Sequence, residues 1–259
     1  MRVPWHNIRL EVSPNFENIV EYCRSIDDNF QNLTFIIQNR RNDIRLTNVN
    51  ELYLVVKSFK GMYWPNRLAY SIFRKSKAQR SFETSIRLLK MGFHVPAPVA
   101  YIDYYRWGFL QSSYFVSVYH KHEDFATAVS KYSKSHNFTN IFASFAFRLH
   151  QAGVNQHDFS NGNILCNIQD GDIHFSMVDL NRVHFGTVRY CKGLRSLSKL
   201  NIEQSYFDEI LKKYSELSEQ PFEKAARFIR IQKYVRNTNR RFRFLLKRIF
   251  FPSRVQRTM

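Results

Sequence analysis

The pattern of hydrophobic and polar positions divides the chain into a strand-rich first part and a mainly helical remainder. Short apolar runs over 33–37, 44–46 and 52–57 are separated by polar residues, which is typical of antiparallel strands. Two further strands are predicted over 99–102 and 114–119. We therefore expect an antiparallel sheet in the first half of the chain.

Helical periodicity follows the first strands. Phe82, Ile86 and Leu89 recur at i, i+4 and i+7, which predicts a helix over 76–91 that ends at Gly92. The remaining predicted elements are a helix over 138–151, a β-hairpin from 164–168 and 173–179, and helices from about 194 to 251.

Length and composition indicate a folded chain of one large or two small domains. The 259 residues are 44% hydrophobic and 16% aromatic, which is ample for a packed core and excludes wholesale disorder. We expect an α+β fold with a strand-rich N-lobe over 1–119 and a helical C-lobe over 120–259, with a hinge at the polar stretch 120–124.

Charge points to anionic partners. The chain has 39 Lys and Arg against 21 Asp and Glu, a net charge of +18, and such a positive field concentrates phosphate- or carboxylate-bearing ligands. Three cysteines without metal or disulfide spacing suggest a reducing compartment. No signal peptide or apolar run of roughly 20 residues is present, so we expect a protein that is soluble or lies on a membrane surface.

One segment carries the clearest chemistry. Asp158 and Asn163 have the D-x-x-x-x-N spacing of a kinase catalytic loop, and Asp179 follows at the end of the predicted hairpin. Phosphoryl transfer needs a carboxylate beside the acceptor hydroxyl and oxygen ligands for Mg²⁺ at the nucleotide phosphates. Asp158 is thus a candidate catalytic base, and Asn163 and Asp179 are candidate metal ligands.

A kinase-like fold also requires a lysine on a central strand and a glutamate on the next helix. Lys57 and Glu83 meet these two requirements, and strand alternation places Lys57 on the same face as Val55 and Tyr53. Lys60 is an alternative for the lysine, and an ordinary strand-end lysine and a solvated glutamate are the plainer interpretations of Lys57 and Glu83.

These motifs together resemble the Kdo/WaaP lipopolysaccharide kinase family over roughly residues 30 to 235. The residues that carry the resemblance are Lys57-Ser58-Phe59, segments of 66–78, His157 to Asn163, and Asp179-Leu180-Asn181-Arg182. It implies a small protein-kinase fold that transfers the γ-phosphate of ATP to an inner-core sugar. By this resemblance Lys57 and Glu83 hold the nucleotide, Asp158 is the base, and Asn163 and Asp179 bind Mg²⁺.

The chain departs from protein kinases in several places. Its first glycine is Gly61, so no glycine-rich loop precedes Lys57, and the phosphates would be covered by the turn at 39–43 through Arg40 or Arg41; an exposed hairpin turn is the alternative. It has Gln156-His157-Asp158 in place of His-Arg-Asp, and no Ala-Pro-Glu follows Asp179. These departures favour a small-molecule or glycolipid acceptor.

Two basic regions remain. Arg67, Arg74, Lys75, Lys77 and Arg80 could meet an anionic acceptor or form a solvated helix face. The C-terminal segment 236–259 has eight cations and no acid, and its apolar residues repeat at helical spacing, as in a helix that lies in an anionic bilayer interface. A helix packed on the C-lobe, with a basic tail, is the alternative. The apolar residues are Phe242, Leu245, Leu246, Ile249 and Phe250.

The sequence therefore predicts an ATP- and Mg²⁺-dependent kinase that phosphorylates a Kdo or heptose hydroxyl of a lipopolysaccharide or lipid A–core intermediate, cytoplasmic and peripheral on the inner membrane, with no nucleic-acid partner. A phosphotransferase of the aminoglycoside or choline kinase type is the first alternative, although a chain this basic would repel cationic substrates. A catalytically inactive kinase-like module that binds lipid is the second.

Overall fold

A computed structural model describes residues 7–39, 43–59, 74–132, 137–169 and 172–250, and the side chains of 35–39, 237 and 239–250 fall outside the description. The chain forms two compact units. The first, called the sheet unit, comprises Met1–Glu123 and Asn163–Val183, and the second, called the helical unit, comprises Asp124–Gly162 and His184–Met259. Each unit is therefore made of two separate stretches of the sequence.

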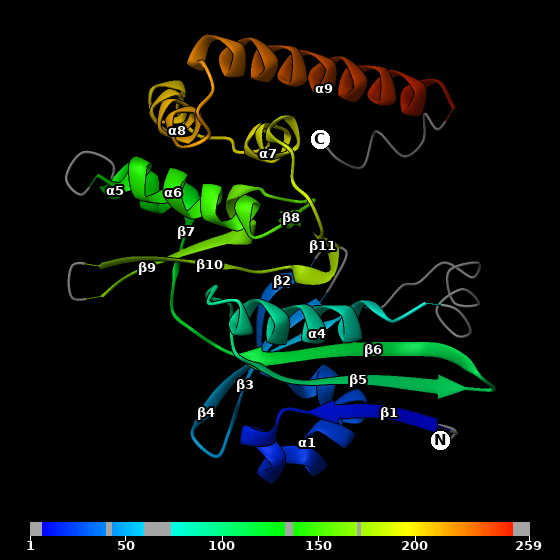
Figure 1. Cartoon of the computed structure of the whole chain (residues 1–259). Coiled ribbons are helices and arrows are strands. Elements are labelled where there is room, and N and C mark those ends of the chain that lie inside the picture. Colours follow the sequence, from blue (N-terminus) through cyan, green and yellow to red (C-terminus); the bar gives the residue numbers. More distant parts are fainter. Residues whose placement is uncertain (1–6, 40–42, 60–73, 133–136, 170–171, 251–259) are drawn as a thin grey trace. The chain divides into compact units, whose positions relative to one another are not determined.

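The sheet unit is built on a six-stranded antiparallel sheet in the order β1-β5-β6-β4-β3-β2 (Figure 1). The apolar runs in the sequence predicted the five strands from β2 to β6. Strand β1 was missed, although Ile8, Leu10 and Val12 alternate with polar residues and the whole strand pairs with β5. The strands are β1 (Asn7–Val12), β2 (Phe35–Asn39), β3 (Asp43–Val49), β4 (Leu52–Ser58), β5 (Pro98–Arg106) and β6 (Phe109–Val118).

Helices lie on both sides of this sheet (Figure 1). One face is covered by short N-terminal helices, whose Cys23 and Phe30 are buried in the same core as Leu54 and Val56 of β4. No helix was predicted there, because segments of three to six residues are too short to show helical periodicity. They are η1 (Pro14–Ile19), α1 (Val20–Arg24), α2 (Ile26–Asn29) and η2 (Phe30–Asn32).

Helix α4 (Lys77–Lys90) covers the other face and confirms the helix predicted over 76–91. It begins at Ser76, whose hydroxyl accepts a hydrogen bond of 2.9 Å from the backbone N–H of Gln79. It ends before Gly92, which has a φ of +78° and so allows the chain to turn back. Phe82 packs on Tyr101 of β5, with ring centroids 5.5 Å apart.

The predicted hairpin forms from β9 (Ile164–Gln169) and β10 (Asp172–Met177) and belongs to the sheet unit. It is attached to the segment that follows α4, because the backbone N–H of Met177 donates to the carbonyl of His94 at 3.2 Å. The His94 and His174 rings also meet, with centroids 5.1 Å apart. This attachment fixes the chain just before the short helix η4 (Leu180–Arg182) and Asp179.

The helical unit packs its helices around an aromatic core. Phe125 and Phe142 lie 4.1 Å apart between ring centroids, and both are fully buried. Its elements are α5 (Phe125–Tyr132), α6 (Phe138–Gln151), β8 (Val154–Gln156), α7 (Tyr190–Leu197), α8 (Gln204–Leu217) and α9 (Phe222–Phe250). Three short elements contain the positions at which the chain passes from one unit to the other: the strands β7 (Glu123–Asp124) and β11 (Val183–Phe185) and the turn η3 (Asn161–Asn163). Within the described part of the chain, no helix is both long and apolar enough to cross a bilayer.

Gly193 of α7 lies against one side chain from α6 and one from α8. A Cβ atom at this position would lie 2.2 Å from Tyr214 Oη and 2.9 Å from His150 Nδ1. Those two atoms form a buried hydrogen bond of 2.9 Å. Burial lowers the pKa of His150 to about 4, so the ring is neutral near pH 7. A side chain at position 193 would therefore force Tyr214 or His150 to shift.

We expect Gly193→Ala to destabilise the protein by about 1–3 kcal/mol, because overpacking outweighs the better helix propensity of alanine. Chemical denaturation followed by circular dichroism measures the loss. Gly162→Ala is the control, since no atom lies within 4 Å of a Cβ at that position. Equal midpoints for Gly193→Ala and the wild type would contradict this account of the packing.

Candidate functional site

Lys57 and Asp179 form an ion pair in the sheet unit. The Nζ atom of Lys57 lies 2.5 Å from Oδ1 of Asp179, and the two side chains are 12% and 24% exposed. Lys57 is on β4, an interior strand, opposite Ile44 of β3 and Phe115 of β6. Its side chain therefore leaves the sheet from a position that is fixed on both sides.

Asp179 is held in an unusual backbone conformation. Its φ and ψ of 56° and 51° are left-handed, which aspartate tolerates better than most residues other than glycine. Asn181 donates from Nδ2 to the same Oδ1 at 2.6 Å. The carboxylate is thus oriented from two directions, by Lys57 and by Asn181.

The backbone of Asn163 is joined to the residue before Asp179 in the sheet unit. Its backbone carbonyl accepts a hydrogen bond of 3.0 Å from the N–H of Val178, the residue before Asp179. The β9–β10 hairpin produces this contact, because its register pairs Ile164 with Met177. Two of the predicted metal ligands therefore come together at the base of one hairpin.

Further positive charges act near the Lys57–Asp179 pair, around Lys77. The ammonium groups of Lys57 and Lys77 lie 5.2 and 5.9 Å from the centroid of the Phe59 ring. Burial lowers the pKa of Lys77, and the positive charges of Arg182 and Arg80 lower it further, whereas Asp179 raises it. Because one carboxylate faces several cations, this region has a positive potential that suits a polyanion.

The predicted pair between Lys57 and Glu83 is not the one that the structure forms. Glu83 instead pairs with Lys75, at 2.7 Å, and accepts from Gln79 one turn earlier on α4, at 3.0 Å. Glu83 and Lys75 are 37% and 58% exposed, so little desolvation opposes their contact. Lys60, Arg40, Arg41 and Arg67 lie outside the described residues.

Asp158 belongs to the helical unit, and that unit fixes the loop around it. Lys199 donates from Nζ to the backbone carbonyl of His157. Burial lowers the pKa of Lys199, while the negative charge of Asp158 raises it. The loop is also tied at Asn161, whose Nδ2 donates to the carbonyl of Asn201 at 2.6 Å and whose Oδ1 accepts from the Asn201 N–H at 3.0 Å.

Within the described residues, no group of three or more His, Cys, Asp or Glu side chains could form an all-protein metal cage. Asp179 and Asn163 instead offer a carboxylate and an amide from two segments whose backbones meet at one hairpin base, and these groups suit a hard cation that keeps water and phosphate ligands. Mg²⁺ binds in this way, through one or two protein oxygens and substrate phosphates. The donor chemistry of these two residues therefore fits the predicted metal.

Comparison with solved structures bears on the fold. WaaP in complex with acyl carrier protein matches with a TM-score of 0.61 and 15% sequence identity, covering 89% of this chain and 98% of that chain. The chain has a protein-kinase-like fold. This result confirms the predicted two-lobed α+β class and, at the level of the fold, the resemblance to WaaP.

A second match is the Rio2 kinase–ADP/Mg²⁺–phosphoaspartate complex from Chaetomium thermophilum. Its TM-score is 0.47 at 15% identity, and the match covers 79% of this chain and 65% of that chain. No protein-family model and no curated protein sequence matches the chain. The likeness to WaaP is therefore visible in the fold and not in overall sequence.

Sequence reasoning missed the contribution of two lysines. Lys77 was assigned to a general basic patch, and Lys199, which is 41 positions from Asp158, was not considered at all. No local motif marks either residue. Lys77 reaches Phe59 because α4 packs on the sheet, and Lys199 reaches His157 because α7 ends beside the loop.

The charge cluster predicts the titration of Lys77. We expect its ammonium pKa to lie below that of an exposed lysine, to fall further in Asp179→Asn, and to rise in Arg182→Gln, because these changes remove an attractive and a repulsive charge. NMR titration of the ¹³C-methylated lysines, with Lys77→Arg for assignment, measures this. Shifts in the same direction for both variants would contradict the cluster.

Proposed function

We propose that this chain is an ATP- and Mg²⁺-dependent kinase that phosphorylates a sugar hydroxyl, of Kdo or heptose type, on a lipopolysaccharide inner-core intermediate. The observation that carries the proposal is the Lys57–Asp179 pair beside Asn163 in a protein-kinase-like fold. Phosphoryl transfer depends mainly on positioning and charge neutralisation, and this region supplies both.

The residues of the sheet unit would receive the nucleotide. Lys57 would hold a phosphate oxygen, and Lys77 and Arg182 would add positive charge where the chain has no glycine-rich loop before Lys57. Asp179 and Asn163 would hold Mg²⁺, which neutralises phosphate charge when bound. Lys57 and Asp179 now neutralise each other, so neither charge lacks a partner before the nucleotide arrives.

The helical unit would act on the acceptor. Asp158 would accept a hydrogen bond from the acceptor hydroxyl and take its proton as the hydroxyl oxygen bonds to the γ-phosphorus and the bond from that phosphorus to the departing ADP breaks. Because the loop is tied on both sides of Asp158, through His157 and Asn161, its carboxylate would keep one orientation. A fixed base of this kind lowers the entropic cost of reaching the transition state.

These roles predict distinct losses of activity. We expect Asp158→Ala to lower phosphate transfer by ~100-fold or more, as for loss of a general base, and Asp179→Ala to abolish Mg²⁺-dependent turnover. The assay follows ³²P transfer from ATP to lipid A precursors, Kdo-lipid and aminoglycosides.

Asp172→Ala is the control, since this exposed carboxylate lies on the same hairpin at its opposite end. Circular dichroism establishes that each variant is folded. No transfer to any acceptor by the wild type, or equal activity in the wild type and Asp158→Ala, would refute the enzymatic proposal. Preferred transfer to an aminoglycoside would support the first alternative.

We further propose that the enzyme docks peripherally on the cytoplasmic face of the inner membrane through α9. This helix continues to Phe250, as predicted. Ile231, Tyr234 and Val235 are 51%, 72% and 47% exposed on it. Their spacing continues in the sequence as the apolar repeat from Phe242 onward. An exposed apolar stripe with cations between its residues suits an anionic bilayer surface. The acyl carrier protein solved with WaaP is indirect support for a lipid-related partner.

Vesicle sedimentation tests this docking. With vesicles containing anionic phosphatidylglycerol, we expect Arg240→Gln/Arg241→Gln to bind roughly tenfold more weakly, because the variant removes two positive charges from a segment that would adsorb to anionic lipid. Tyr234→Ser/Val235→Ser should also bind more weakly. The matched control is Lys212→Gln/Lys213→Gln on α8, which removes the same charge. Equal weakening by the control, or binding that is insensitive to all three variants, would refute docking through α9.

A further inference from the structure

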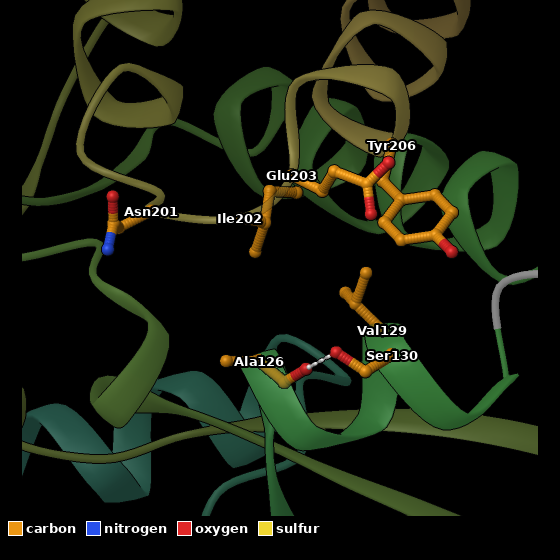
Figure 2. A pocket seen from close by; sticks show the side chains of 7 residues that line it. All are labelled: Ala126, Val129, Ser130, Asn201, Ile202, Glu203 and Tyr206. Carbon is orange, nitrogen blue, oxygen red and sulfur yellow. Dashed lines mark hydrogen bonds between the residues drawn. The ribbon is translucent and has the colours of Figure 1, made fainter.

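A pocket of about 290 Å³ lies in the helical unit, between α5 and the start of α8 (Figure 2). Its polar lining consists of Ser130, Asn201, Glu203 and Tyr206, and its apolar lining of Ala126, Val129 and Ile202. Figure 2 shows the side chains of Glu203 and Tyr206 on one side of the pocket and those of Val129 and Ser130 on the other. Nothing in the roles assigned above uses this pocket.

The pocket is connected to the catalytic loop through its own wall. Asn201, which lines it, forms the reciprocal hydrogen bonds with Asn161, three residues after Asp158. Lys199, two residues before Asn201, donates to the carbonyl of His157 and is attracted to the charge of Asp158. The wall is therefore joined to the loop on both sides of Asp158, which holds the pocket at a constant position relative to the backbone of that loop.

The chemistry of the lining suits an uncharged polyol. A carboxylate, a phenol, a hydroxyl and an amide can accept from and donate to several hydroxyl groups, while Val129 and Ile202 can contact the carbon-bound hydrogens of a ring. Ser205 donates to Oε1 of Glu203 at 2.7 Å, which orients that carboxylate. Glu203 is the charged residue of the lining and no cation lines it, so a carboxylate or phosphate would be repelled at this point.

We propose that this pocket is an acceptor subsite that binds an uncharged, polyhydroxylated sugar ring, with Glu203 and Tyr206 as its specificity-determining residues. The inference rests on the proposed function for the role of Asp158. It assigns the two regions of the acceptor to different surfaces: anionic groups to the basic parts of the chain, and a neutral ring to this pocket.

Binding of simple sugars tests the subsite without nucleotide. The full-length protein, with ¹³C-labelled isoleucine methyl groups, is titrated with methyl α-mannopyranoside as a neutral probe and with galacturonic acid as an anionic one. We expect the neutral sugar to shift the Ile202 methyl signal with a dissociation constant of roughly 1–10 mM, as for a small polar ligand. The acid should bind more weakly.

Glu203→Gln distinguishes specificity from simple filling of the pocket. It should weaken binding of the neutral sugar roughly fivefold, since a charge-assisted hydrogen bond becomes a neutral one. It should strengthen binding of galacturonate, since a repulsion between two carboxylates is removed. Glu216→Gln, at the far end of α8, the helix that begins after Glu203, should change the affinity for neither sugar. No saturable shift of Ile202, stronger binding of the acid to the wild type, or identical behaviour of Glu203→Gln and the wild type would overturn the proposal.

Failure of this proposal can be told apart from failure of the proposed function. If the sugar binds as expected but no phosphate reaches any acceptor, the kinase proposal fails and the subsite stands. If phosphate is transferred and the KM for the acceptor is the same in Glu203→Gln as in the wild type, the kinase proposal stands and the subsite fails.

Discussion

The contact between Lys57 and Asp179 joins two parts of the sheet unit that are 122 residues apart in sequence. It requires an interior strand that presents a lysine to the α4 face, and a hairpin that delivers an aspartate to the same point. The carboxylate cannot balance all the cations near it, because Lys77, Arg80 and Arg182 also contribute positive charge. That imbalance makes the region suitable for phosphate groups rather than for a further cation alone.

In the helical unit, hydrogen bonds hold the loop around Asp158, which has little regular structure, in one conformation. Its ties are made to backbone atoms, by Lys199 to the His157 carbonyl and by Asn161 to both polar groups of the Asn201 backbone. In β8, which precedes the loop in the sequence, the buried Asn155 accepts a hydrogen bond of 2.9 Å from the Ser196 hydroxyl at its Oδ1. These hydrogen bonds hold the backbone of the loop on both sides of Asp158.

Much of the fold was predictable because long elements repeat their hydrophobic pattern. Helices α4 and α6 and strands β2 to β6 were found in this way, whereas the N-terminal helices were too short to show a period. Candidate site residues could be proposed where the motif spacing is local, as for Asp158 and Asn163, and their roles stay predictions. The partner of Lys57 could not be predicted from the sequence. Glu83 pairs with Lys75 instead of Lys57, and this choice depends on the orientation of α4 and on how its first turn meets the chain before it.

The sequence by itself determined which residue types are available to the candidate site, the strand alternation that turns Lys57 to one face, and the basic, acid-free C-terminal segment. These features depend only on residues that are near one another in the sequence, so they do not require knowledge of the tertiary structure. The tertiary structure decided which charges meet: Lys57 with Asp179, Lys77 with the Phe59 ring, and Lys199 with the loop of Asp158. Side chains so far apart in sequence come together through strand register and helix packing, and no local pattern encodes either.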